Sequence, residues 1–196
     1  KSHDLSVNDA FMAAVMTGMQ AYHERHGAIA ESLRVNVPIS LRGDAGDRSG
    51  QAANAVAIAR FPMHVANQST VELMHQAHDL VAKWRREPAM RLADPLAEGS
   101  WFVPVPMLAS VARASDITTS NVPGPPIPIY LAGSRMIAVY PLVATIGAAV
   151  NVTMVTYDGK AFIGVSTDDR AIGDHADLMH DLRAGFHAAT LPGDTL

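Results

Sequence analysis

The stretch Thr118-Thr119-Ser120-Asn121 holds the side chains best suited to contact a reacting group. It runs directly into Val122–Pro128, whose prolines stiffen the chain and remove backbone donors. One interpretation is structural: a strand with polar side chains in water, closed by a polyproline segment. The other places Ser120 or Asn121 at a strand end, as a hydrogen-bond donor to the negative charge that develops on an acyl oxygen. Spacing alone leaves both interpretations open.

The pair Asn8-Asp9 lies at the start of a segment with helical periodicity. Ser6 and Asp9 have the spacing of a capping box, in which each side chain bonds to the backbone of the other residue. Polar side chains of this kind suit a helix N-terminus. The pair therefore has a structural interpretation unless another observation connects it with a site.

A metal site has one candidate, His75-x-x-His78-Asp79. On a helix His75 and His78 would be neighbours, so two ring nitrogens could converge on one ion. No third ligand follows at a fixed offset, and His75 and Asp79 fall on the polar face of the expected helix. We therefore predict no metal and no cofactor.

Other chemistries are excluded by what the sequence lacks. It has no cysteine, which rules out thiolate catalysis and disulfides. It has no Gly-x-Ser-x-Gly elbow, and Gly43-Asp44-Ala45-Gly46 lacks the Lys-Ser/Thr of a phosphate-binding loop. The net charge of −4, without a dense basic cluster, argues against nucleic acid as a partner.

The composition is that of one globular domain, with 196 residues, 48% hydrophobic and 17% charged. The longest apolar run, Val139–Val150, is interrupted by Pro141 and Gly147 and is shorter than the about 20 residues of a membrane span. The first residue is Lys and a predicted helix follows almost at once. We therefore expect the chain to be a piece of a longer polypeptide.

Hydrophobic periodicity and chain breakers predict the elements that position these residues. Helices are expected at Ser6–His26, Ser69–Glu87, Pro104–Ala114 and Asp174–Ala189. Strands are expected at Arg34–Leu41, Ala53–Phe61, Asp116–Asn121, Ser134–Leu142, Ala149–Tyr157 and Lys160–Thr167. Asp158-Gly159 predicts a two-residue hairpin turn, and Arg42–Gly50 and Glu87–Gly99 predict surface excursions. Without regular strand–helix alternation, this order predicts an α/β protein of the α+β type, a mixed sheet with flanking helices.

Several short motifs, read together, resemble one family. They are Val7-Asn8-Asp9-Ala10-Phe11, Val37-Pro38-Ile39-Ser40-Leu41-Arg42, Ser120-Asn121-Val122-Pro123-Gly124-Pro125, Tyr140-Pro141, Asn151-Val152-Thr153 and Tyr157-Asp158-Gly159. In this order they resemble the C-terminal half of the bacterial wax ester synthase/diacylglycerol acyltransferase family, within the CoA-dependent acyltransferase superfamily. The resemblance covers essentially the whole chain, so residues 1–196 are expected to be a C-terminal domain.

The resemblance implies one half of a chloramphenicol-acetyltransferase-like two-domain enzyme. Such an enzyme moves a fatty acyl group from acyl-CoA, a substrate rather than a cofactor, to a long-chain alcohol or diacylglycerol. The family's general-base histidine lies in a His-His-x-x-x-Asp-Gly motif of the N-terminal half. This sequence has no His-His pair, so no catalytic residue is expected in it and the chain alone should be inactive. The alternatives are a non-catalytic lipid- or acyl-chain-binding domain and a structural partner domain.

The resemblance also implies roles for single residues. Ser120, Asn121 and, as a weaker candidate, Thr118 would bind substrate or support the oxyanion. Asn8 and Asp9 would support the site. Pro123, Gly124 and Pro125 would brace the donors from behind. The expected partners are the N-terminal half, acyl-CoA and a hydrophobic alcohol or diacylglycerol, in the cytoplasm with peripheral contact to membranes or lipid droplets.

Overall fold

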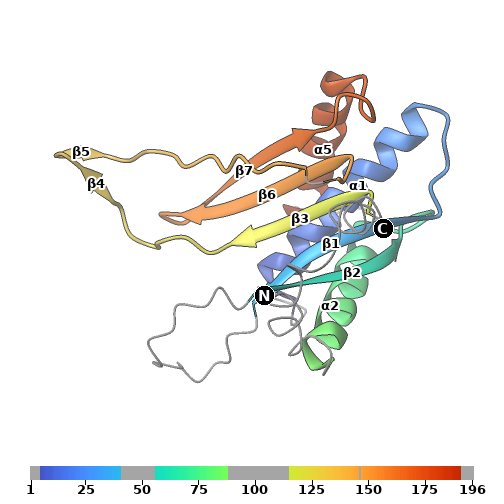
Figure 1. Cartoon of the computed structure of the whole chain (residues 1–196), viewed down its shortest axis with the longest axis horizontal. Helices are drawn as coiled ribbons and strands as arrows, with labels where there is room; N and C mark the ends of the chain where they lie inside the picture. Colours follow the sequence, from blue (N-terminus) through green and yellow to red (C-terminus); the bar gives the residue numbers. More distant parts are fainter. Residues whose placement is uncertain (1–4, 41–55, 88–114, 146, 191–196) are drawn as a thin grey trace, which may run out of the picture.

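The computed structural model describes residues 5–40, 56–87, 115–145 and 147–190. Figure 1 shows a twisted sheet with helices packed along one of its faces and a long arm that reaches beyond the sheet. The helices are α1 (Val7–Arg25), α2 (Thr70–Arg86) and α5 (His175–Thr190). The strands are β1 (Ser32–Ser40), β2 (Val56–His64), β3 (Ile117–Val122), β4 (Tyr130–Leu131), β5 (Ser134–Arg135), β6 (Val150–Tyr157) and β7 (Lys160–Thr167).

The main sheet has the order β2-β1-β3-β6-β7, and β4 and β5 form a separate two-stranded ribbon. The central strands β1, β3 and β6 run parallel, whereas β2 and β7 are antiparallel to their neighbours. The sheet is therefore mixed and flanked by helices, which confirms the predicted fold class. Within the described residues no helix is long and apolar enough to cross a membrane.

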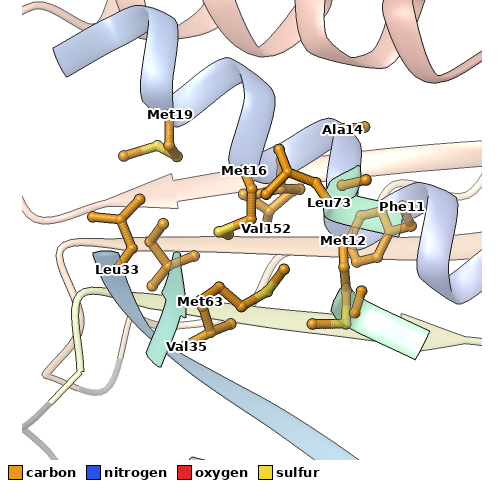
Figure 2. Close-up of a cluster of buried hydrophobic side chains, with 14 of the residues drawn as sticks. Phe11, Met12, Ala14, Met16, Met19, Leu33, Val35, Met63, Leu73 and Val152 are labelled. Carbon is orange, nitrogen blue, oxygen red and sulfur yellow. The ribbon is translucent and has the colours of Figure 1, made fainter. Parts of the chain in front are cut away.

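The core lies between the sheet and α1, which packs against both α2 and α5. Alternate residues of the strands point into it, and Figure 2 shows methionines of α1 meeting side chains of β1, β2, β6 and α2. Burying each large apolar side chain contributes roughly 1.5–3 kcal/mol. The residues labelled in Figure 2 are Phe11, Met12, Ala14, Met16, Met19, Leu33, Val35, Met63, Leu73 and Val152.

Local signals in the sequence predicted the element ends well. Ser6 and Ser69 are the N-caps of α1 and α2, and both form complete capping boxes. Asp158 and Gly159 have φ angles of 49° and 73° in the turn between β6 and β7. Both angles are positive, as the tight hairpin turn requires, so the predicted hairpin is confirmed.

Two predicted strands differ from the structure. The strand expected to end before Pro62 continues to His64, because β2 is an edge strand and a missing backbone donor is tolerated on its outer side. The strand expected at Ser134–Leu142 is limited to Ser134–Arg135. The rest of that segment is extended but pairs with no strand among the described residues. The helix expected at Pro104–Ala114 and the excursion at Arg42–Gly50 lie outside the described residues, and so does the excursion at Glu87–Gly99 except for Glu87 itself.

Candidate functional site

The residues predicted to contact substrate lie on β3, at the centre of the sheet. Thr118 and Ser120 pair with Asn151 and Thr153 of β6 and share their side of the sheet. Asn121 pairs instead with Met154, which belongs to the core under the helices. Neighbouring strand residues point to opposite faces. Thr118 and Ser120 thus lie on the face away from the helices, here called the open face, and Asn121 lies on the helix side.

A polar network surrounds β3 on the open face. On the β1 side, the Asn36 Oδ1 accepts hydrogen bonds from Arg60 Nε at 2.9 Å and from Ser115 Oγ at 2.7 Å. On the β6 side, Thr153 Oγ1 donates to Asn151 Oδ1 at 2.8 Å. In these hydrogen bonds the polar side chains beside β3 are partners of one another, and the bonds hold their rotamers fixed.

The hydroxyls of Thr118 and Ser120 have no hydrogen-bond partner among the described residues, and both residues are partly exposed. A hydroxyl that is not committed to its own fold is free to donate to a ligand. Within the described part of the chain, the open face therefore presents two hydroxyl donors on one strand without protein partners.

An ion pair fixes the start of β3 to β1. Asp116 accepts from the backbone N–H of Arg34 at 2.8 Å and from its guanidinium Nε at 3.1 Å. Burial alone would raise the pKa of Asp116, but the hydrogen bonds from Arg34 outweigh it and hold that pKa below its ordinary value. The carboxylate stays ionised, so β3 is held in register beside β1.

The pair Asn8-Asp9 lies at the end of the sheet where the parallel strands end. Only six residues separate α1 from β1, so α1 runs back along the sheet and begins near the carboxyl end of β1 and β3 (Figure 1). Ligands of open α/β sheets commonly bind beyond the carboxyl ends of the strands. The topology therefore brings the two predicted groups, on α1 and β3, to one end of the molecule.

Asp9 is buried and joins two helices there. Its Oδ2 accepts from the backbone N–H of Ser6 at 2.8 Å, which completes the predicted capping box. The same oxygen lies 3.1 Å from Nδ1 of His78 on α2. The sequence pattern grouped His78 with His75, but the structure pairs it with Asp9. No signal in the sequence could show this, because the two residues are 69 positions apart.

The proline-rich segment is anchored to the end of the β6–β7 hairpin. The backbone N–H of Gly124 donates to Thr156 Oγ1 at 3.1 Å, and the carbonyl of Pro125 accepts from the backbone N–H of Asp158 at 3.1 Å. Any Cβ at Gly124 would collide with the carbonyl of Thr156. A glycine is therefore needed for this close approach.

Thr119 is a buried polar residue that the sequence did not single out. It is 1% exposed, and its hydroxyl has no hydrogen-bond partner in the described part of the chain. It pairs with Val152 and so lies on the helix side of β3, as Asn121 does. Such an unpartnered buried hydroxyl costs stability.

Comparison with known proteins agrees with this architecture. The family described as "WS/DGAT C-terminal domain", the wax ester synthase/diacylglycerol acyltransferase C-terminal domain, matches residues 52–189. The Acinetobacter baylyi "O-acyltransferase WSD" is 26% identical over 196 residues, which cover 93% of this chain and 41% of that protein. A Mycobacterium tuberculosis protein provisionally named a diacylglycerol O-acyltransferase is 28% identical, over 92% of this chain and 37% of its own length.

Solved structures give the same fold. The wax ester synthase/diacylglycerol acyltransferase from Marinobacter aquaeolei superposes with a TM-score of 0.62 at 21% identity, over 94% of this chain and 43% of that one. An X-domain from teicoplanin biosynthesis, solved with OxyB, superposes with a TM-score of 0.58 at 15% identity, over 98% of this chain and 42% of that one. The chain thus spans roughly two fifths of the length of the proteins that it matches.

Proposed function

Because this chain belongs to the family of wax ester synthase/diacylglycerol acyltransferase C-terminal domains, we propose that it forms one wall of an O-acyltransferase active site. The enzyme would move a fatty acyl group from acyl-CoA to a long-chain alcohol or diacylglycerol. Residues 1–196 would be its C-terminal domain, and the N-terminal half would be its partner. The observation that carries the proposal is the family match combined with the hydroxyls of Thr118 and Ser120, which have no hydrogen-bond partner among the described residues.

The proposed chemistry divides between the two halves. A histidine of the N-terminal half takes the proton of the acceptor hydroxyl, and the acceptor oxygen attacks the carbonyl carbon of the thioester. The carbon–sulfur bond then breaks, and the same histidine returns the proton to the sulfur of CoA. Because this sequence has no His-His pair, the chain by itself is proposed to be inactive.

Within this scheme, Ser120 donates a hydrogen bond to the carbonyl oxygen as it becomes negatively charged. Thr118, on the same face but further from the strand end, is the weaker candidate. Asn121 faces the helices, so we assign it, together with Asn8 and Asp9, to support of the site. The segment Pro123–Pro125 holds the end of β3 through its contacts with the β6–β7 hairpin.

The first test replaces Ser120 with alanine and measures acyl transfer. The chain is combined with the N-terminal half, and release of CoA from palmitoyl-CoA is followed in the presence of hexadecanol. Loss of an oxyanion donor should reduce kcat by about 100-fold, with a smaller effect on KM. Ser166→Ala is the matched control, because Ser166 pairs with Asn151 on the same face but lies on β7. Equal rates for the two variants would remove Ser120 from the proposed site.

A non-catalytic lipid-binding or structural partner domain is the second candidate, and the exposed apolar side chains of Leu131, Ile137 and Leu142 favour it. It predicts that no acyl transfer occurs even when the N-terminal half is present.

A transferase of the kind proposed first makes a water-insoluble product. We therefore propose that the enzyme acts in the cytoplasm, in peripheral contact with a membrane or lipid-droplet surface.

A further inference from the structure

The open face carries a row of polar side chains across four neighbouring strands. Each strand contributes one residue, and each residue is the register partner of the next. In the order of the sheet the row consists of Arg60, Asn36, Thr118 and Asn151. Neighbouring strands lie about 5 Å apart, so a molecule bound on this face can contact more than one member of the row.

Arg60 is the member of this row with unused donors. It is partly buried, and its Nε donates to Oδ1 of Asn36 at 2.9 Å. The same oxygen accepts from the hydroxyl of Ser115 at 2.7 Å, and Asn36 and Ser115 are only 7% and 4% exposed. The guanidinium is therefore held by a buried anchor. Its terminal amino groups form no hydrogen bond with a described residue, so within that part of the chain they remain for a ligand.

The charge of Arg60 has no counterion in the described part of the chain. Arg34, which lies on the same face of the sheet, is by contrast neutralised by Asp116. The guanidinium of Arg60 bonds there only to the neutral amide of Asn36. A partly buried cation without a counterion is costly, and acceptor oxygens on a bound molecule would reduce this cost. Arg60 therefore points to a ligand that carries such oxygens.

An apolar surface lies next to the polar row. Pro38 and Ile58 pair with each other two positions beyond Asn36 and Arg60, toward the carboxyl ends of β1 and β3. Ile58 is 63% exposed. Ser120 lies in the same direction from Thr118. A molecule that contacts both rows must combine acceptor oxygens with hydrocarbon, as an ester-bearing lipid does.

We propose that Arg60 binds an ester carbonyl oxygen of a diacylglycerol acceptor and thereby makes diacylglycerol a better acceptor than a simple long-chain alcohol. This inference rests on the proposed function, because it concerns the acceptor of that reaction. Hydrogen bonds from a guanidinium to an oxygen are charge-assisted and stronger than those between neutral groups. Arg60 is thus a specificity-determining residue, and it takes no part in proton transfer.

The position of Arg60 relative to Ser120 suits this acceptor. Ser120 lies on β3, two strands away from β2, so at about 5 Å per strand the two backbones are about 10 Å apart. The side chain of Arg60 reaches back toward β3 as far as Asn36. In a diacylglycerol the reacting hydroxyl and both esters share one glycerol backbone, so an ester can reach Arg60. The phosphates of CoA lie beyond the whole pantetheine arm, much further from the thioester.

A simple long-chain alcohol cannot provide this contact. Its one oxygen is the atom that reacts, so its hydrocarbon chain would cover the open face and leave the guanidinium without an acceptor. A polar group that loses water without gaining a partner weakens binding. A site that binds a polar group of its substrate therefore discriminates against a substrate that lacks this group.

The test compares two acceptors with one donor. The chain is combined with the N-terminal half, and CoA release from palmitoyl-CoA is followed with dioleoylglycerol or with hexadecanol, in the same detergent micelles. Arg60→Met removes the donors but keeps a long, unbranched side chain. We expect kcat/KM for dioleoylglycerol to fall at least about tenfold, because a charge-assisted hydrogen bond is lost. The value for hexadecanol should change by less than about twofold, since hexadecanol never makes this bond.

Two further variants separate recognition from a general effect. Arg60→Lys keeps the positive charge but not the planar fork, so it should recover part of the activity toward dioleoylglycerol. Arg183→Met is the matched control, because Arg183 is exposed on α5, on the other side of the sheet. It should leave both reactions unchanged. The Tm of each variant shows whether a loss reflects unfolding.

Two results would overturn the assignment of Arg60. An equal loss with both acceptors would place Arg60 against acyl-CoA, which the two reactions share. No loss with either acceptor would remove it from the site. If the unmodified chain transferred no acyl group to any acceptor, the proposed function would be wrong instead. Binding of a fluorescent diacylglycerol to the combined halves would then still test Arg60, and an unchanged Kd in Arg60→Met would contradict its role.

Discussion

At the scale of single residues, the strand β3 separates two side chains that the sequence grouped together. Ser120 and Asn121 are adjacent, so in one strand they face opposite sides of the sheet. The hydroxyl of Ser120 lies on the open face beside Thr153, whereas Asn121 lies beside Met154 on the helix side. The two residues therefore have different surroundings, which is why Ser120 and not Asn121 is the proposed contact with the acyl group.

Thr119 lies between Thr118 and Ser120 on β3, and we expect its buried hydroxyl to lower the stability of the fold. Its buried hydroxyl has no partner among the described residues, so Thr119→Val removes a desolvated group while keeping the shape. We expect the free energy of unfolding to rise by about 1 kcal/mol. Urea unfolding followed by circular dichroism measures it.

Thr153→Val is the paired control on the neighbouring strand. Thr153 is equally buried, but its hydroxyl donates to Asn151 at 2.8 Å. Its loss should lower the free energy of unfolding by about 1 kcal/mol. If Thr119→Val also lowered the free energy of unfolding, the hydroxyl of Thr119 would have a hydrogen-bond partner outside the described residues.

At the scale of elements, α1 and α5 approach each other through glycines. A Cβ at Gly18 would lie 2.7 Å from the Cα of Leu182, and a Cβ at Gly185 would collide with the carbonyl of Ala14. Beside this crossing, Arg25 of α1 bonds to Asp181 of α5 through two hydrogen bonds of 2.8 and 2.6 Å. Close packing and one bidentate ion pair together fix these helices over the sheet.

Gly185→Ala should push the two helices apart. Backbone atoms surround the missing Cβ, so they cannot yield without moving a helix, and we expect a loss of about 1–3 kcal/mol. Thermal unfolding measures it as a lower Tm. The control is Gly173→Ala, because a Cβ there meets no atom within 4 Å. A Gly185→Ala protein as stable as this control would contradict the close crossing.

At the scale of the whole molecule, stability should depend on the ionisation of Asp181. The hydrogen bond from Arg25 lowers the pKa of Asp181 below its ordinary value, although burial opposes this effect. A carboxyl with a lowered pKa in the folded state stabilises the fold above its unfolded pKa of about 4, and this contribution is lost as the pH falls further. The same reasoning applies to Asp116 beside Arg34.

Acid should therefore unfold the chain in part through this pair. We expect the urea midpoint to fall between about pH 5 and pH 3, and to fall less steeply in Asp181→Asn, which has no carboxyl to titrate. Asp79→Asn is the control, because Asp79 is exposed and forms no ion pair with a described residue. An identical slope in all three proteins would show that Asp181 does not contribute.

The sequence by itself determined the features that depend on residues a few positions apart. The capping boxes at Ser6 and Ser69 and the turn at Asp158-Gly159 are local, since the side chain or φ angle involved acts on the backbone beside it. Alternating and helical periodicity likewise predicted the mixed sheet with flanking helices, because one face of each element must be buried.

Only the tertiary structure decided which distant residues meet. The contact of Asp9 with His78, and the hydrogen bonds of the Tyr157 phenol with Ile129 and Met136, join residues that no local pattern connects. The segment after Arg135 has the alternation of a strand but lacks a partner among the described residues, so a pattern alone could not place it in the sheet. Strand pairing is a long-range property, and it fixed the face of the sheet on which Ser120 lies.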